Sequence, residues 1–347
     1  MSRLVTINDI ARELNTTPAT VSRALNNHRS ISEEKKKLIV ETAERLNYRR
    51  NSIASSLRLG HTKVLGVIIP SAEINFFGRV VHGIENHAAK NGYNVLIFQS
   101  NEMRSYEVRG IETLLSARVD GIMVSIAKDT ADYSHFLMAK KSKTPIIFFD
   151  RVNNDLGINS VMVNDYQGAF MATEHLIQQG YKRIAHISGP SHIKIFNDRL
   201  KGYMGALQAN NIKVDFDLTV QGDVSVEAGR EAMERLLAFD NLPDAVFAVE
   251  DFTALGAMKV LKEHNVNIPQ DFGVIGFANE GFCEHISPTL STMDQQTAQM
   301  GMEAFDLMLA QIEDKNSGKA ERRTVVLDPL PVFRESSARL KFLGANK

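Results

Sequence analysis

Polar and aromatic side chains follow several apolar stretches that read as buried strands. They include carboxylates, an amide, two arginines and a pair of phenylalanines. Carboxylates and amides bind hydroxyl groups, an arginine donates several hydrogen bonds in one plane, and aromatic faces cover apolar rings. Each residue alone is better explained as a helix cap or a surface residue, so their shared position is what predicts a small-molecule site. The nine residues are Phe76, Phe77, Asp150, Arg151, Arg199, Glu250, Asp251, Asn279 and Glu280.

No pattern of catalytic or cofactor-binding residues accompanies them. The chain has no GxGxxG after a strand, no GxxxxGK[ST] and no GxSxG. His82 and His87 stand five residues apart, which does not place them on one helical face for a metal ion. Cys283 has no motif around it. We therefore expect a protein that is not an enzyme, with no catalytic residue, metal or cofactor.

The elements that must position the nine residues alternate between strands and helices from Val64 onward. Further strands are expected at 93–99, 121–125, 145–149, 183–188, 218–221, 245–249 and 273–277, and near 324–333. Helices are expected at 77–91, 104–117, 130–141, 166–179, 197–210, 225–238, 252–264 and 296–313. This alternation predicts two α/β lobes, each a doubly wound parallel sheet, with a ligand beyond the carboxyl ends of the strands.

A different pattern occupies the start of the chain, where apolar residues recur at helical spacing in two short segments. Thr6 and Thr17 precede these segments as N-caps. Asn15 tolerates the left-handed backbone of a tight turn, and Pro18 fits the first position of a helix. The outer face of the second helix is short and polar, with Ala19, Thr20, Ser22, Arg23 and Asn26. This pattern predicts a helix-turn-helix that binds DNA, although any small three-helix domain contains similar turns.

Charge is divided unevenly along the chain, whose net charge is −1. Residues 1–60 hold 11 Lys and Arg against 6 Asp and Glu, a balance of +5, and the rest carries −6. A basic head on a mildly acidic body fits phosphate contact at one end only.

A third helix is expected at about 33–46, after the helix-turn-helix. Its lysines 35–37 are equally well explained as phosphate contacts or as a solvated face.

The chain has the composition expected in the cytoplasm. A single cysteine rules out an internal disulfide. No apolar run approaches the roughly 20 residues needed to span a bilayer, and no signal peptide precedes the first helix. We therefore expect a cytoplasmic protein without membrane contact.

Residues 47–63 are polar and basic, and on their own they read either as a linker or as a segment that folds on a partner.

Specific motifs extend from end to end. They are TINDIARELNTTPATVSRALN, NSIASSLRLGHTKVLGVIIP, RVDGIM, PIIFFDR, GAFMATEHLIQQGYKRIAHISGP, RLKGYMGAL, PQDFGVIGFANE and PTLSTMDQ. With them the chain resembles the LacI/GalR family of bacterial transcription regulators. The resemblance implies a head at 1–47, a hinge at 48–61 with a helix at about 51–58, and a body at 62–340 like a periplasmic sugar-binding protein. The body's lobes are then about 62–162 with 292–323, and about 163–291 with 324–340, and the chain crosses between them three times.

The resemblance also implies DNA contacts. Pro18, Ala19 and Arg23 match base-reading positions, and Leu57 matches the hinge leucine that enters the minor groove. Residues that match phosphate-contacting positions, together with a neighbouring loop arginine that we include, are Thr6, Thr17, Thr20, Ser22, Asn26 and Arg29.

In the body, the resemblance makes Phe76 and Phe77 an aromatic platform and Arg199 a ligand clamp. The chain departs from the family at Ala278, where an Asp is usual, and at Glu250, where an Asn is usual. Two explanations remain open. Asn279 or Glu280 binds the sugar hydroxyls in place of the usual Asp, or the ligand is different from the sugars that the family usually binds. We expect a dimeric repressor of a near-palindromic operator, controlled by a sugar or oligosaccharide bound between the lobes. The alternative is a sugar-binding protein that does not act through DNA.

Overall fold

The computed structural model describes residues 5–48, 61–314 and 322–339. The chain divides into two compact units, Met1–Thr62 and Lys63–Lys347, which are called the head and the body below. The expected hinge helix at about 51–58, including Leu57, lies outside the described residues.

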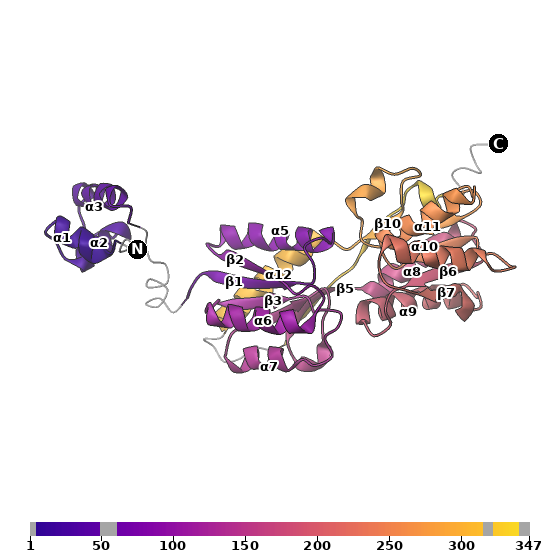
Figure 1. The fold of residues 1–347 in the computed structure, drawn as a ribbon, viewed down its shortest axis with the longest axis horizontal. Helices are drawn as coiled ribbons and strands as arrows, with labels where there is room; N and C mark the ends of the chain where they lie inside the picture. The colour runs from indigo at the N-terminus through magenta and orange to yellow at the C-terminus, as the bar shows by residue number, and fades with distance from the viewer. Residues whose placement is uncertain (1–4, 49–60, 315–321, 340–347) are drawn as a thin grey trace. The chain divides into compact units, whose positions relative to one another are not determined.

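Three helices form the head: α1 (Ile7–Glu13), α2 (Pro18–Leu25) and α3 (Glu33–Arg45) (Figure 1). Their apolar faces meet in one small core of Ile10, Ala11, Val21, Ala24, Ile39 and Ala43. This core fixes α2 against the other two helices, so its remaining face is left for solvent or a partner.

Local signals in the sequence set the turn between α1 and α2. Asn15 adopts the expected left-handed backbone, with φ of 46°. The hydroxyl of Thr17 accepts a hydrogen bond from the backbone N–H of Thr20 at 3.2 Å and caps α2. At the start of α1, Oδ2 of Asp9 accepts hydrogen bonds from the backbone N–H (2.9 Å) and the hydroxyl (2.7 Å) of Thr6.

The first lobe of the body is a six-stranded parallel sheet in the order β11-β5-β4-β3-β1-β2. Its strands are β1 (Val64–Ile69), β2 (Asn94–Gln99), β3 (Gly121–Val124), β4 (Ile146–Phe149), β5 (Asn159–Val163) and β11 (Thr324–Leu327). Helices α5 (Asn75–Lys90) and α12 (Thr297–Asp314) share the core on one face. Helices α6 (Arg104–Ser116) and α7 (Ser134–Lys141) cover the other (Figure 1).

The second lobe is a four-stranded parallel sheet in the order β7-β6-β8-β9. Its strands are β6 (Ile184–Ser188), β7 (Thr219–Gln221), β8 (Ala245–Ala248) and β9 (Gly273–Ile275). Helices α8 (Asp165–Gln178) and α9 (Lys194–Ala209) share one core. Helices α10 (Val226–Leu237) and α11 (Asp251–Glu263) share another. Four short 3₁₀ helices complete the described body, at Asn154–Leu156, Phe216–Leu218, Gly281–Glu284 and Glu335–Ser337.

A two-stranded antiparallel sheet, β10 (Thr292–Asp294) with β12 (Leu330–Val332), lies beside the second lobe. Bridges from Ile275 to Ser291 and from Ala278 to Asp294 join this sheet to the end of β9. The described chain therefore passes between the lobes three times: after β5, between β10 and α12, and between β11 and β12.

These pairings correct the expected lobe boundaries. Residues 324–327 were expected in the second lobe, but β11 pairs with β5 and forms an edge of the first sheet. Residues 292–294 were expected in the first lobe, but β10 is bridged to the second. Strands β5 and β10 were not predicted at all. The pairings of β11 with β5 and of β10 with β12 join segments distant in sequence, so local pattern does not specify them.

Candidate functional site

The outer face of α2 is the exposed surface of the head. Pro18, Ala19, Arg23 and Asn26 are exposed, while Thr20 and Ser22 are half-buried. Thr17 and Arg29 flank this face and are also exposed, and Thr6 is half-buried at the start of α1. The structure thus brings the DNA-contact residues expected within 5–48 to the exposed edges of α1 and α2.

Arg23 is the cation on this face. It makes no ion pair with any described residue, whereas Arg45 pairs with Glu13 and Arg12 with Asp9 on other faces. Lys36 pairs with Glu33 at 2.6 Å, which favours a solvated face over a phosphate contact for that lysine. A guanidinium held away from intramolecular carboxylates remains available for a base edge or a phosphate.

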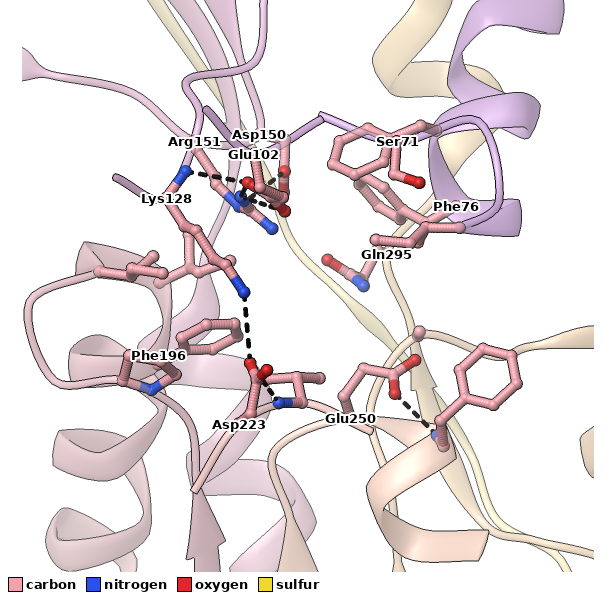
Figure 2. Close-up of a pocket in the computed structure, with 18 of the residues that line it drawn as sticks. Ser71, Phe76, Glu102, Lys128, Asp150, Arg151, Phe196, Asp223, Glu250 and Gln295 are labelled. Carbon is pink, nitrogen blue, oxygen red and sulfur yellow. Dashed lines mark hydrogen bonds and ion pairs between the residues drawn. The ribbon is translucent and has the colours of Figure 1, made fainter. Parts of the chain in front are cut away.

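A cavity of about 340 Å³ lies between the lobes, beyond the carboxyl ends of their strands (Figure 2). This position confirms what the strand pattern predicted. Its first-lobe lining consists of Ser71, Glu73, Ile74, Phe76, Phe77, Glu102, Lys128, Asp150 and Arg151. Its remaining lining consists of Pro190, Ile193, Ile195, Phe196, Arg199, Asp223, Val224, Glu250, Phe252, Ala278 and Gln295.

Aromatic rings supply much of the apolar surface of the cavity. The rings of Phe76 and Phe77, on the first turn of α5, meet edge to face with centroids 5.1 Å apart. Phe196 on α9, labelled in Figure 2, and Phe252 on α11 line the cavity from the opposite lobe. The two lobes therefore present apolar faces that can cover a ring between them.

Asp150 and Arg151 follow β4 and enter the cavity side by side. Asp150 has a left-handed backbone with φ of 60°, a conformation that a non-glycine residue adopts only where its surroundings enforce it. Burial raises the pKa of Asp150 to about 6, and the neighbouring Arg151 opposes the rise. Arg151 donates hydrogen bonds from one terminal nitrogen to both oxygens of Glu102, at 2.9 and 2.7 Å. Its Nε is buried without a hydrogen-bond partner among the described residues.

Lys128 and Asp223 join the lobes across the cavity. Their Nζ and Oδ1 atoms are 3.6 Å apart (Figure 2), and Nε2 of His192 lies 3.0 Å from the carbonyl oxygen of Lys128. The backbone N–H of Lys128 donates to Glu102 at 2.9 Å. Sequence reasoning missed Lys128, Asp223 and Glu102, although each follows a strand end, which is the signal that located the other lining residues.

Arg199 on α9 is held inside the protein. Only 2% of its surface is exposed. Nε donates to Asp165 at 2.8 Å, and the two terminal nitrogens donate to the carbonyl of Val249 at 2.7 Å and to the side chain of Gln295 at 3.2 Å. Its guanidinium also lies 3.8 Å from the ring centroid of Phe277. Arg199 lines the cavity as expected, but most of its hydrogen-bonding capacity is already used by the fold.

Glu250 is the N-cap of α11. Its Oε2 accepts a hydrogen bond from the backbone N–H of Phe252 at 2.7 Å (Figure 2). Burial raises the pKa of Glu250 to about 8, with the charge of the adjacent Asp251 as the second cause. The carboxyl group therefore holds a proton at neutral pH unless a ligand changes its surroundings.

Three of the nine expected residues do not line the cavity. The carboxylate of Asp251 accepts hydrogen bonds from the hydroxyl of Thr292 (2.6 Å) and the backbone N–H of Glu280 (2.8 Å), inside the second lobe. Asn279 is held by Asp294 and Arg334 at 2.8 and 2.9 Å. Asp251 is the first residue of α11, and Asn279 has a left-handed backbone with φ of 56°, so these side chains turn into the lobe and not toward the cavity.

Glu280 connects the lobes on another side. Its Oε2 accepts hydrogen bonds from Asn75 at 3.1 Å and from Arg79 at 3.3 Å, both on α5. Arg79 also donates to the carbonyl of Asn279 at 2.9 Å. Glu280 is therefore an inter-lobe contact and not part of the cavity wall.

The described residues lack features of two other kinds of protein, those that span a membrane and those that bind a metal ion. No described helix is both long and apolar enough to cross a lipid bilayer. No group of three or more His, Cys, Asp or Glu side chains within the described ranges is arranged to hold a metal ion.

A helix-turn-helix head joined to a two-lobed body with a ligand-sized cavity defines a class of ligand-responsive DNA-binding regulators. Residues 6–51 match the family model described as bacterial regulatory proteins of the lacI family. Residues 62–339 match the model described as periplasmic binding proteins and the sugar binding domain of the LacI family. The chain belongs to the LacI family and is a helix-turn-helix transcriptional regulator with a ligand-binding body.

Individual relatives resemble the chain along its whole length. The probable HTH-type transcriptional repressor ExuR of Bacillus subtilis is 34% identical, over 92% of this chain and 95% of its own. The HTH-type transcriptional repressor PurR of Pasteurella multocida is 30% identical, over 96% and 98%. The lac repressor dimer bound to operator and the anti-inducer ONPF has the same fold, with a TM-score of 0.86 and 24% identity, over 96% and 99%. Both of these sequence relatives are named as transcriptional repressors.

Proposed function

We propose that this chain is a repressor whose operator affinity is controlled by a sugar or oligosaccharide bound in the cavity between the lobes. One observation carries the proposal: the cavity is walled by both lobes, and the ion pair of Lys128 with Asp223 crosses between them at 3.6 Å. A ligand that contacts both walls favours one lobe arrangement over another. The family model that matches the body is named for sugar binding, which supports a sugar as the effector.

The proposed operator contacts follow from exposure on the head. Arg23 would read a guanine through O6 and N7, while Pro18 and Ala19 would contact a thymine methyl. Thr6, Thr17, Thr20, Ser22, Asn26 and Arg29 would hold phosphates. Leu57, in the proposed hinge at 48–61, would enter the minor groove and bend the duplex.

The proposed assembly is a homodimer on a near-palindromic operator. One head offers a single recognition helix, and a two-fold pair of heads reads two half-sites in opposite orientation. The structural relative bound to operator is itself a dimer, which supports this arrangement. A repressor of bacterial genes acts in the cytoplasm, where the DNA is.

The proposed effector contacts use both lobes. Phe76 and Phe77 would cover a sugar ring, and Asp150, Arg151 and Glu250 would bind hydroxyl groups. Arg199 would contribute only those hydrogen bonds that the fold leaves unused. No catalytic role is proposed for any of these residues.

Selection of bound sequences from a random duplex library tests the proposal. The full chain should enrich an inverted repeat, and fluorescence anisotropy should then show weaker binding of Arg23→Ala to that repeat. Loss of one bidentate base contact predicts a decrease of about 5- to 150-fold, from a contact energy of about 1–3 kcal/mol. The same variant should bind unrelated DNA almost as well as the parent chain does. If no sequence is enriched while a sugar binds the body, the protein senses sugar without acting through DNA.

A further inference from the structure

Every cation that lines the cavity is already matched by a carboxylate. This leaves no positive charge in the wall that is uncompensated among the described residues. The pairs are Arg151 with Glu102 (2.7 Å), Lys128 with Asp223 (3.6 Å) and Arg199 with Asp165 (2.8 Å).

Glu250 is a carboxyl group of the cavity wall without such a match. It makes no ion pair with a described residue, and its Oε2 is used by the backbone N–H of Phe252 at 2.7 Å. Among its charged neighbours, the carboxyl groups of Asp251 and Glu280 raise its pKa, whereas Arg199 lowers it. Figure 2 shows its carboxyl group at the edge of the open space, facing the first lobe.

The surroundings of Glu250 suit a cation. Phe252 lines the cavity from the same lobe as Glu250, and Phe76 lines it from the first lobe, on the opposite side in Figure 2. Aromatic faces attract ammonium groups, and a carboxylate that pairs with one forms a charge-assisted hydrogen bond. An anionic group placed there would leave Glu250 protonated and would gain no ion pair, because each cation that lines the cavity is already matched by a carboxylate.

We propose that the effector is a polyhydroxylated molecule with a protonated amino group, as in an amino sugar, and that Glu250 binds this group. The inference rests on the proposed function, because it names the chemistry of the ligand in the same cavity. It makes Glu250 a specificity-determining residue of the cavity. Sugars with a carboxylate or phosphate in this position would gain no ion pair from Glu250 and should bind less tightly.

Isothermal titration calorimetry of the full chain against matched sugars tests the inference. Within each set the sugar ring is constant and only its substituent changes. The first set is glucosamine, N-acetylglucosamine, glucose and glucuronate, and the second is the corresponding galactose series. The third consists of the β-1,4-linked disaccharides of glucosamine, N-acetylglucosamine and glucose. We expect the amine of one set to bind about tenfold or more tightly than its neutral members, which corresponds to about 1.4 kcal/mol. The carboxylate should bind more weakly still.

Two variants locate the preference. Glu250→Gln keeps an oxygen acceptor for the N–H of Phe252 and should abolish the preference for the amine while retaining neutral sugars. Glu231→Gln removes the same charge from an exposed position on α10 and should leave the preference unchanged.

The inference is overturned if a neutral or acidic member binds most tightly, if Glu250→Gln keeps the preference, or if no member of any set binds. Release of the operator from the full chain on addition of each sugar is measured separately, by fluorescence anisotropy of labelled operator DNA. An acidic or neutral sugar that binds and releases the operator would refute the inference while supporting the proposed function. An amine that binds through Glu250 without changing operator affinity would refute the proposed function alone.

Discussion

Removing the guanidinium of Arg199 should destabilise the body strongly, so weaker ligand binding in such a variant would not by itself show a ligand contact. Arg199 and Asp165 are 2% and 4% exposed, and their charged atoms are 2.8 Å apart. In Arg199→Ala, Asp165 keeps a buried position but loses its cation. Burial already raises the pKa of Asp165 and Arg199 opposes that rise, so the variant carboxyl group either takes up a proton or remains as an unpaired buried charge.

The buried ion pair of Arg199 with Asp165 sets the expected loss of folding free energy. Breaking such a pair by deleting one partner costs about 3–5 kcal/mol of folding free energy. Val249 and Gln295 also lose their hydrogen-bond donor. At about 2–4 °C for each kcal/mol in a unit of this size, the melting temperature of the body should fall by roughly 6–20 °C.

Urea unfolding of the full chain, followed by circular dichroism, measures the change. The double variant Arg199→Met with Asp165→Asn carries no unpaired charge and should recover most of the lost free energy. A loss below about 1 kcal/mol in the single variant, or no recovery in the double variant, would refute a structural role for Arg199. Ligand affinity measured in the stable double variant then separates binding from folding.

Two further predictions concern packing and pH. Gly83→Ala should destabilise the body, because an added Cβ would lie 2.6 Å from the carbonyl oxygen of Ala298 at the start of α12. Gly78→Ala on the same helix meets no atom within 4 Å and should be neutral or stabilise the body by up to about 1 kcal/mol; thermal unfolding giving equal losses would contradict the close helix contact. Glu250 has a folded pKa of about 8, above its unfolded value of 4.5. Between pH 4.5 and about 8 the folded state therefore holds a proton that the unfolded state lacks, and this stabilisation is lost progressively over that range. The melting temperature should fall more between pH 5 and 8 in the parent chain than in Glu250→Gln, and parallel curves would contradict a raised pKa of Glu250.

The head could be predicted in detail because its signals are local. Asn15, Thr17 and Pro18 each have a conformational reason to stand where they do, and the structure confirms the turn, the cap and the first helical position. Strand and helix alternation in the body was predicted for the same reason. β10 reads Thr-Met-Asp, without an apolar run, and becomes a strand only by pairing with β12. Such pairings depend on tertiary contacts that local periodicity does not contain.

The cavity could be predicted only in part. The rule that ligands bind at strand ends selected Phe76, Phe77, Asp150, Arg151 and Glu250, which all line the cavity. It failed for residues one or two positions further on, because backbone geometry decides which neighbour faces the cavity. Ala278, with φ of 142°, lines the cavity, whereas the next residue turns into the lobe. The pairing of cavity cations with carboxylates likewise depends on distances across the fold, so the charge balance of the site appears only in three dimensions.

The most direct test of the account is to measure the affinity of one effector with and without the operator. Effector binding and operator binding are linked, so each must change the other by the same factor. Calorimetry of the full chain with and without the selected inverted repeat gives one factor, and anisotropy with and without saturating effector gives the other. The account predicts two equal factors that differ from one. Effector affinity that is identical in the presence and absence of the operator would contradict control of DNA binding through the cavity.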